Sequence, residues 1–557
     1  MGFFAANCMK RVLHIHPSDN IVVALTDLSR GEIITVNNRQ VTLVDDIRQK
    51  HKFSIADLSV GDDLLMYGVL VGKAVKAIPT GGLISTMNVQ HAAGEFGTRQ
   101  RTFQWQAPDV EKWGHRTFRG YHRSDGQVGI RNYWLVIPLV FCENRNMEVF
   151  RDAMQQELGY GRPEMYRRVV RHMVEAYRNT EDVQAIRDIH FREKATEDGS
   201  SRVFDHVDGI KFLMHEGGCG GTREDAQNLC ALLAGYCHNP NVGGITVLSL
   251  GCQHAQLSML QEAIQARNPH FDKPLLCFEQ QQWPSEYKML TQAMRKTFLG
   301  MMEINRLRRS PATLDKLTVG VKCGGSDGFS GISANPAVGY CADLIAALGG
   351  KIVLAEFPEL CGVEQELINR SVSDEVAAKF AALMREYQRR ATAVGADFSM
   401  NPSPGNIRDG LITDAMKSAG AARKGGTSPV ADALGYPEYA TRSGLNLLCT
   451  PGNDVEATTG MAAAGCTVQL FTTGLGTPTG NPISAMVKIS TNTALARRMS
   501  DIIDLDAGTI ITGDKTVEQV GEDILDYVIG LASGDYDTCA MRLGQEDFIP
   551  WKRGVSL

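Results

Sequence analysis

The chain has 557 residues, of which 43% are hydrophobic and 22% charged, and its formal net charge is -6. This length predicts several domains, and the composition is typical of a soluble globular protein. The net charge and the lack of basic tracts argue against nucleic acid as a partner. No run of about 18 apolar residues occurs, which argues against a membrane span. The 13 scattered cysteines argue against a secreted disulfide scaffold. We therefore expect a cytoplasmic protein with reduced thiols.

Residues 1–95 are predicted to form a small, mostly β domain, because short β-branched runs recur at close intervals and glycines separate them. His14 and His16 alternate along the first run, so they would lie on one strand face and could bind a metal or an anion. An ordinary, partly exposed strand face is an equally good interpretation. Residues 96–119 are polar with scattered aromatic side chains, and we expect an extended linker that lies on the following domain.

From residue 120 onward, strands alternate with helices. The region 120–310 and the region 311–557 both show this order, which predicts βαβ units and mainly parallel sheets. The segment 143–200 is helical and heavily charged, so we interpret it as a solvated helical insert rather than a charged binding site. Prolines 402 and 404 argue against a helix where they occur. The predicted fold class is α/β, with a small N-terminal β domain and two α/β regions.

Four predicted strands end at a cysteine: Cys142, Cys219, Cys252 and Cys323. The carboxyl ends of strands in α/β proteins are where ligands bind, so these thiols could converge on one site; buried core thiols are the alternative. None has the C-x-x-C spacing of a structural zinc site. A divalent transition metal, iron in particular, suits a mixture of thiolate, imidazole and carboxylate ligands, and an iron-sulfur cluster is a less favoured variant.

The stretch VGVKCGGSDGFSG, residues 319–331, is the clearest of these strand ends. Its paired glycines permit positive φ and close approach of a ligand, and Ser326 and Asp327 offer a hydroxyl and a carboxylate. A tight turn beside one buried cysteine is the alternative interpretation. The chain has no Walker phosphate loop, nucleophile elbow or dinucleotide-binding glycine pattern, which argues against the enzyme classes that use them.

Several blocks of sequence resemble the altronate and galactarate dehydratases. In order along the chain they are GYHRSDGQVGIRN, HEGGCGG, NPNVGGITVLSLGCQ, KCGGSDGFSGISANPAVGY, NPSPGN, GLNLLCTPGND and FTTGLGTPTGNP. The resemblance extends from residue 11 to the C-terminus and implies an N-terminal β-clip domain of the SAF type. It also implies a hydro-lyase that converts an aldonic or aldaric acid to a 2-keto-3-deoxy acid with ferrous iron. D-altronate is the favoured substrate, and galactarate or a related acid is the alternative.

The matching positions supply candidate site residues. The catalytic candidates are His215, Lys424 and Asp327, with His215 or Lys424 as general base because burial can neutralise both. The substrate-binding candidates are Ser326, Asn335, Asn406, Asn453, Asp454, Thr477 and Lys488. The candidate ligands of Fe2+, of another divalent metal such as Mn2+, or of an iron-sulfur cluster are Cys142, Cys219, Cys252, Cys323 and His16. Solvated surface lysines are the alternative for Lys424 and Lys488.

The chain departs from the pattern of altronate dehydratases in two places. Those enzymes usually carry His-x-His-Asn where this chain has STMN (85–88), and a Glu and a Cys where it has Ala415 and Ala421. The first departure puts a metal-binding role of the β domain in doubt. A carbon-sulfur lyase of the sulfolactate type resembles the same domains, but it usually splits them over two chains, so one continuous chain argues against it. The lost His and Cys make a non-catalytic sugar-acid-binding protein a further alternative. The expected partner is a small sugar acid, with a homodimer as one option.

Overall fold

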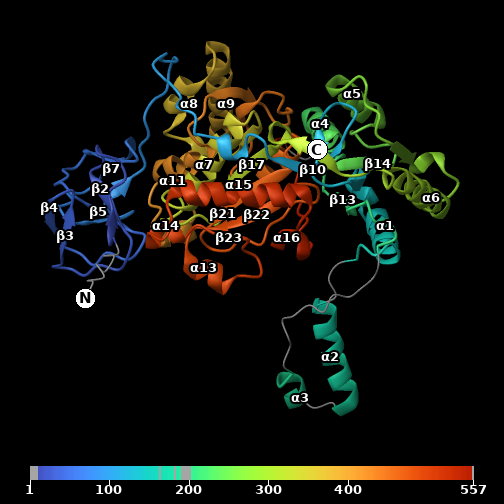
Figure 1. Ribbon diagram of the computed structural model, residues 1–557, viewed down its shortest axis with the longest axis horizontal. Coiled ribbons are helices and arrows are strands. Elements are labelled where there is room, and N and C mark those ends of the chain that lie inside the picture. Colours follow the sequence, from blue (N-terminus) through green and yellow to red (C-terminus); the bar gives the residue numbers. More distant parts are fainter. Residues whose placement is uncertain (1–9, 162–164, 181–182, 190–201, 555–557) are drawn as a thin grey trace.

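A small β unit stands at one end of the molecule, beside two larger bodies that are each built on a parallel sheet (Figure 1). The computed structural model describes residues 10–161, 165–180, 183–189 and 202–554. None of the helices in these ranges is long and apolar enough to cross a membrane. The α/β class and the small N-terminal β unit agree with the sequence prediction.

The N-terminal β unit consists of antiparallel sheets with the strand orders β1-β2-β5-β8, β3-β4 and β6-β7-β9. Strand β3 alternates exposed and buried residues, because one face of its sheet packs on a core and the other meets solvent. Its strands are β1 (Val12–Leu13), β2 (Ile21–Ala24), β3 (Ile33–Val36), β4 (Arg39–Thr42), β5 (Lys52–Ser54), β6 (Asp63–Met66), β7 (Val69–Ala74), β8 (Leu83–Ile84) and β9 (Val89–Gln90).

The segment that follows β9 runs over the C-terminal body and not over the region that comes next in sequence. The amide of Gly97 donates to Gln365 at 2.8 Å, and the indole of Trp105 donates to the hydroxyl of Thr427 at 3.2 Å. These contacts hold an extended segment that ends in a short helix, η1 (Glu111–Trp113). The N-terminal β unit is thereby tied to the C-terminal body.

The second body is built on a four-stranded parallel sheet of order β13-β12-β14-β15. A small antiparallel sheet of order β11-β10-β16 adjoins it. Its strands are β10 (Thr117–His122), β11 (Val128–Gly129), β12 (Tyr133–Pro138), β13 (Gly209–Phe212), β14 (Val242–Ser249), β15 (Leu275–Glu279) and β16 (Ser310–Thr313). Its helices are η2 (Phe141–Glu143), α1 (Asn144–Glu157), α4 (Arg223–His238), α5 (Leu257–Arg267), η3 (Gln280–Gln282) and α6 (Glu286–Ile304).

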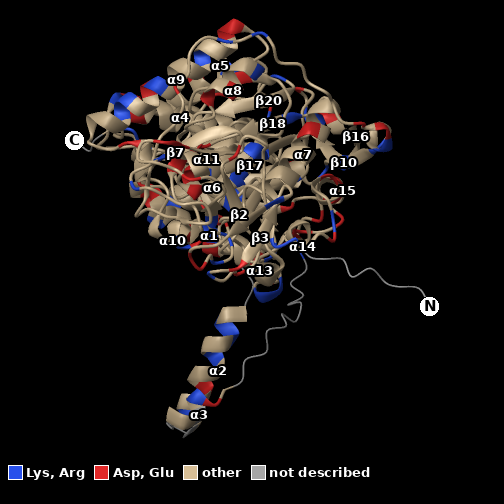
Figure 2. Cartoon of the chain, turned by 90° about the vertical axis from the view of Figure 1, so that its left-hand side faces the viewer, with Lys and Arg blue, Asp and Glu red and all other residues tan. Residues whose placement is uncertain are grey.

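The charged segment 143–200 has two different parts. Helix α1 packs on the sheet, and its Met147 and Phe150 are fully buried, so this helix belongs to the core rather than to a solvated insert. Helices α2 (Met165–Thr180) and α3 (Val183–Arg187) project away from the rest of the molecule in both views (Figures 1 and 2). The remainder of this segment lies largely outside the described residues.

The C-terminal body contains a seven-stranded parallel sheet of order β19-β20-β18-β17-β21-β22-β23. Its strands are β17 (Thr318–Cys323), β18 (Lys351–Leu354), β19 (Val430–Leu434), β20 (Gly444–Leu448), β21 (Val468–Thr473), β22 (Ala485–Ser490) and β23 (Leu505–Asp506). Every residue of β17, β21 and β22 is buried, because helices cover both faces of the sheet.

The helices of this body surround its sheet (Figure 1). They are η4 (Leu314–Lys316), α7 (Ala334–Ala347), η5 (Phe357–Leu360), α8 (Glu364–Arg370), α9 (Asp374–Ala393), η6 (Phe398–Met400), α10 (Pro404–Arg408), α11 (Asp414–Ala422), η7 (Arg423–Gly425), α12 (Asp454–Ala463), α13 (Thr493–Arg498), α14 (Thr509–Thr512), α15 (Val517–Ser533) and α16 (Cys539–Arg542). Helix α10 contradicts the prediction from the prolines, because Pro404 occupies the first helical turn, where its missing N–H costs nothing. Helix α12 packs against α4 and joins the two bodies.

Candidate active site

A cluster of buried charged side chains lies at the carboxyl edge of the seven-stranded sheet. Cys323 is the last residue of β17, Glu356 follows β18, and Asp454 is the first residue of α12. A Cβ atom at Gly324 would lie 2.6 Å from the carboxylate oxygens of Asp454, so glycine makes room for this carboxylate at the strand end. This is the edge at which ligands bind in open α/β sheets.

Two fully buried lysines connect the members of this cluster. Lys322 pairs with the carboxylate of Glu356, and its Nζ lies 2.8 Å from Oδ1 of Asp454. The Nζ of Lys424 lies 3.1 Å from Oε2 of Glu356 and 3.2 Å from the sulfur of Cys323. Each ammonium therefore has at least two acceptors, which is what a buried charge requires.

A third lysine extends the cluster outward. The Nζ of Lys417 lies 2.7 Å from Oε1 of Glu359 and 3.0 Å from the side-chain oxygen of Asn401. The second oxygen of Glu359 lies 3.3 Å from the sulfur of Cys323. Three carboxylates and three ammonium groups thus alternate across the edge. We call Lys322, Cys323, Glu356, Glu359, Lys417, Lys424 and Asp454 the lysine–carboxylate cluster.

The two glutamates of the cluster have different electrostatic environments. Burial, together with the charge of Glu359, raises the pKa of Glu356. Burial opposes ionisation of Glu359 as well, but the ammonium groups of Lys417 and Lys424 outweigh it and lower its pKa to about 2. Neighbouring carboxyl groups whose pKa values are driven apart are typical of acid–base sites.

The backbone of Glu356 adopts φ 73° and ψ 64°, the left-handed region. A residue with a Cβ atom pays a steric cost there, so the surrounding contacts must hold it. One of them is the hydrogen bond that the amide of Glu356 donates to the hydroxyl of Thr450, at 2.9 Å. Backbone strain at a buried carboxylate is an observation typical of functional sites.

Lys424 is not neutralised by burial as the sequence prediction required. Burial does lower its affinity for a proton, but the Cys323 and Glu356 acceptors reverse the effect and raise its pKa. It is therefore an ammonium ion, unsuited to act as a base. Lys488 behaves differently: burial lowers its pKa to about 8, and its Nζ donates to Gln545 at 2.9 Å. Neither lysine is a solvated surface residue, since both are fully buried.

Lys488 faces the same side of the sheet as Lys322. In the sheet register Lys322 is opposite Phe471, and Phe471 is opposite Lys488. Both ammonium nitrogens lie over the Phe471 ring, 5.9 Å and 6.0 Å from its centroid. The shared register of Lys322, Phe471 and Lys488 therefore places Lys488, with its pKa of about 8, on the side of the sheet that carries the lysine–carboxylate cluster.

Several predicted substrate ligands hold the local structure. Asp327 accepts hydrogen bonds from Ser330 and Thr491 and pairs with Lys50 of the N-terminal β unit at 2.8 Å. Asn335 bonds to Thr472 and Gly420, Asn406 donates to the backbone of Ser326, and Asn453 caps α12. Thr477 packs beside Gly325.

Ser326 is buried, and its hydroxyl has no hydrogen-bond partner among the described residues. Asp454 alone of this set makes a charged contact within the cluster.

His215 is buried at the end of the four-stranded sheet, and both ring nitrogens have backbone partners. Nε2 lies 2.8 Å from the carbonyl oxygen of Pro138, and Nδ1 accepts from the amide of Gly217 at 3.1 Å. The geometry assigns the proton to Nε2. Burial lowers the pKa of His215 to about 4, so the ring is neutral but has no free lone pair in this arrangement.

Three of the predicted thiol ligands are exposed and lie on neighbouring loops. Cys142, Cys219 and Cys252 follow β12, β13 and β14, which are adjacent in the sheet. The loops are bonded to one another, since the amide of Phe141 donates to Gly217 and that of Ala255 donates to Gly218, both at 3.1 Å. The other described cysteines are buried or partly buried.

The four predicted cysteine ligands do not form one site. Cys323 lies in the lysine–carboxylate cluster of the other sheet, and the sulfur atoms of the three exposed cysteines do not all lie within 4.8 Å of one another. His16 lies in the N-terminal β unit, where its Nδ1 is 2.7 Å from the hydroxyl of Ser18. None of these residues except Cys323 belongs to a group of three close potential ligands in the described part of the chain.

A cavity of about 560 Å³ lies at the end of the four-stranded sheet, between the loop that carries Cys219 and helix α12 of the C-terminal body. Its lining includes Glu216, Cys219, His254, Glu456, Phe548 and Trp551. Helix α12 passes from this cavity to the lysine–carboxylate cluster, because Glu456 lies in the lining and Asp454 pairs with Lys322. The volume is in the range of small-molecule sites.

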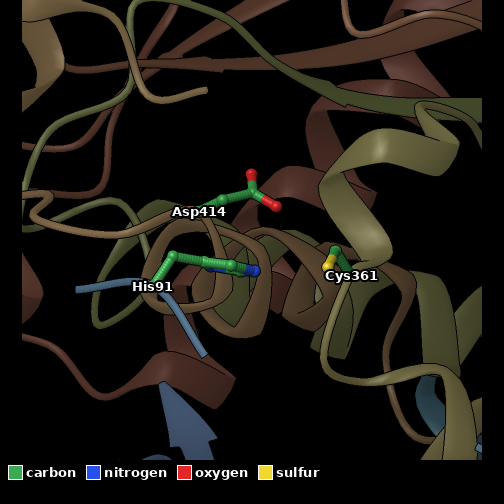
Figure 3. Close-up of side chains that lie close together, drawn as sticks. All are labelled: His91, Cys361 and Asp414. Carbon is green, nitrogen blue, oxygen red and sulfur yellow. The ribbon is translucent and has the colours of Figure 1, made fainter. Parts of the chain in front are cut away.

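Two groups of described residues bring three potential metal ligands within 4.8 Å of one another. One is Cys323, Glu356 and Glu359, whose ligand atoms are already paired with ammonium groups, so it does not fit a cation. The other is His91, Cys361 and Asp414, whose side chains point toward one another (Figure 3). Within this second group, Cys361 is two residues after Glu359, and Asp414 is about one helical turn before Lys417 in α11.

The charged residues of the cluster were only partly predictable. Glu356 was visible as a polar residue directly after a strand, but Lys322 is hidden inside an apolar run, and Glu359 and Lys417 lie in segments whose folding was not predicted. Their pairing depends on tertiary contacts between residues that are 34 to 132 positions apart in the sequence. A lysine within a buried strand was the available signal, since such a lysine requires a partner.

Comparison with known proteins agrees with this architecture. Models of an altronate/galactarate dehydratase SAF domain, of the second domain of D-galactarate dehydratase/altronate hydrolase and of the C-terminal domain of D-galactarate/altronate dehydratase match residues 10–92, 120–305 and 314–556.

Characterised relatives match over nearly the whole chain. Altronate dehydratase of Bacillus subtilis is 33% identical over 530 residues, 94% of this chain and 96% of the relative. Altronate dehydratase of Escherichia coli is 31% identical over 546 residues, 98% and 99% of the two chains. Galactarate dehydratase (L-threo-forming) of Escherichia coli is 29% identical over 543 residues, 96% and 94%. The chain belongs to the altronate/galactarate dehydratase family of hydro-lyase enzymes.

Proposed function

We propose that this protein dehydrates a sugar acid, with D-altronate as the favoured substrate, to a 2-keto-3-deoxy acid at the lysine–carboxylate cluster. The observation that carries the proposal is the position of the buried pair Glu356 and Glu359, held by three lysines at the carboxyl edge of the seven-stranded sheet; their pKa values are driven in opposite directions. The names of the relatives support the substrate class, because altronate and galactarate are both sugar acids.

In the proposed reaction, Lys488 removes the proton from C2 of the substrate. Its pKa of about 8 leaves part of the amine neutral near pH 7, as a general base needs. The electron pair of the C2–H bond moves toward the substrate carboxylate and forms an enediolate. Lys322 and Lys424 are permanently charged and would stabilise this negative charge.

Glu356 then acts as the general acid in this proposal. Its pKa is raised whereas that of Glu359 is lowered, so Glu356 is the glutamate that takes up a proton more readily, and it passes this proton to the C3 hydroxyl as the C3–O bond breaks and water leaves. The resulting enol takes a proton at C3 and releases the proton of its C2 hydroxyl to solvent, which gives the 2-keto-3-deoxy acid. Glu359 stays ionised and keeps Lys417 and Lys424 in place.

The family resemblance implies ferrous iron. The sulfur atoms of Cys142, Cys219 and Cys252 do not converge on one point, so we propose that these residues would hold iron as an iron-sulfur cluster, the variant less favoured from the sequence, rather than as a single Fe2+ ion. Their exposure on bonded loops beside the cavity supports this assignment, since cysteine is otherwise among the most buried residues. When bound, such a group supplies a Lewis acid at the cavity wall.

The test is anaerobic incubation of iron-loaded protein with a panel of hexonates and hexarates, assayed for 2-keto-3-deoxy acids. We expect product from D-altronate or from a close stereoisomer, because the arrangement of hydroxyl groups decides which acid fits. Saturable binding without product from any member of the panel would contradict the hydro-lyase function and favour a sugar-acid-binding protein.

A further inference from the structure

We propose that His91, Cys361 and Asp414 bind a single divalent transition-metal ion that joins the N-terminal β unit to the C-terminal body. His91 directly follows β9, Cys361 follows η5, and Asp414 opens α11. One potential ligand atom from each lies within 4.8 Å of the other two, and the three side chains converge in Figure 3. This proposal does not depend on the proposed reaction.

The strongest evidence is the state of Asp414. Its side chain is 1% exposed, and neither carboxylate oxygen has a hydrogen bond of good geometry in the described part of the chain; the thiol of Cys361, a weak donor in the same group, is close enough to interact with it. A buried carboxylate without partners is costly, and proteins retain such groups when a ligand or ion completes them. A metal ion between Asp414, His91 and Cys361 would satisfy both oxygens.

The surroundings of the group favour a cation. Glu359, Glu364 and Asp397 are the nearby acidic residues that act on Asp414, Cys361 or His91. The neighbouring ammonium of Lys417 is directed to Glu359 and Asn401. By contrast, every ligand atom of Cys323, Glu356 and Glu359 already has an ammonium partner. Of the two groups of close potential ligands in the described residues, only the His91 group has ligand atoms that no ammonium contacts.

The ligand types identify the class of metal. An imidazole, a thiol and a carboxylate together suit zinc, iron or cobalt, whereas calcium and magnesium prefer oxygen ligands alone. The ring of His91 is partly buried, and imidazole binds a metal through a ring nitrogen of its neutral form. Its Nδ1 lies 3.4 Å from the amide of Ala415, which places the ring beside the first turn of α11.

The test uses Co2+ as the probe, because a thiolate ligand gives Co2+ an intense near-ultraviolet absorption band. Metal-free, full-length protein carrying Cys142→Ala, Cys219→Ala and Cys252→Ala, which removes the exposed thiols, is titrated with Co2+. We expect one Co2+ per chain and the thiolate band. In this background Cys361→Ser should abolish the band, and Asp414→Asn should weaken Co2+ binding by about 10-fold or more, as loss of a ligand contact does.

The matched control is Cys449→Ser in the same background, because Cys449 is also a buried thiol of the C-terminal body but lies outside the group. It should keep both the band and the affinity. His91→Gln, at a partly exposed position, provides a second variant if Cys361→Ser fails to fold, and it should also weaken binding. Absence of the band in the parent protein, or its persistence in Cys361→Ser, would overturn the proposal. Substrate is absent throughout, so the result is independent of the hydro-lyase activity.

Discussion

Lys488 differs from the other lysines of the site because burial is not offset by a close carboxylate. Its pKa is about 8, whereas nearby carboxylates raise the pKa of Lys322, Lys417 and Lys424. The protonated amine cannot accept a proton, so the turnover number should rise with pH through about 8 and fall about tenfold for each pH unit below it.

The measurement is the pH dependence of kcat for the wild type and for Lys488→Arg. Arginine keeps the positive charge but does not deprotonate in this range, so the variant should lose activity at every pH. A wild-type profile that is flat between pH 6 and 9, or an active Lys488→Arg protein, would remove Lys488 as the base.

Lys424 should affect stability as well as activity. Replacement by Met leaves Glu356 and Glu359 buried with one ammonium partner fewer, which should lower the free energy of unfolding by about 3–5 kcal/mol. Lys379→Met is the matched control, since Lys379 is 41% exposed and its pair with Glu438 should contribute only about 0–1 kcal/mol. Urea denaturation of both variants measures the difference; equal losses would show that the buried pairs stabilise no more than the surface pair.

At the scale of elements, the loops that carry the exposed cysteines depend on close contact between backbones. Gly218 has φ 97°, and a Cβ atom there would lie 2.0 Å from the carbonyl oxygen of Leu139. Gly126 has a similar φ of 79° but nothing within 4 Å of its Cβ position. Gly218→Ala should therefore lower the melting temperature and the iron content, whereas Gly126→Ala should cost only the strain of positive φ, about 1 kcal/mol.

Thermal unfolding and iron analysis of the two glycine variants test this point. If Gly218→Ala and Gly126→Ala lowered the melting temperature equally, the close backbone contact at Gly218 would not be important for stability. If Gly218→Ala lowered the melting temperature but kept the wild-type iron content, the exposed cysteines would not be the iron ligands.

Most elements were predictable where burial leaves a simple pattern. The strands of the parallel sheets read as continuous apolar runs because helices cover both their faces, as in β17 and β21. Helix α1 was misjudged because its many charged residues concealed the buried stripe of Met147 and Phe150. The loop asparagines were assigned to substrate from the positions that match the family, and this role stays a prediction; the capping role of Asn453 depends on where α12 begins, which the family match does not give.

At the scale of the whole molecule, the site draws on elements that sequence alone does not bring together. The segment after β9 brings His91 to α11, and Lys50 of the N-terminal β unit pairs with Asp327 of the C-terminal body. The cavity likewise combines a loop of the second body with α12 and the chain near Trp551. These contacts depend on how the three parts pack, and no local sequence pattern encodes that packing.

The central claim is that the lysine–carboxylate cluster is the site of sugar-acid dehydration. The most direct test compares the rate at which wild-type protein and Glu356→Gln form the 2-keto-3-deoxy acid from D-altronate, with folding of both checked by circular dichroism. We predict that wild type forms the product and that Glu356→Gln, which cannot donate the proton, is slower by about 100-fold or more. A folded Glu356→Gln protein with the wild-type rate would contradict the account.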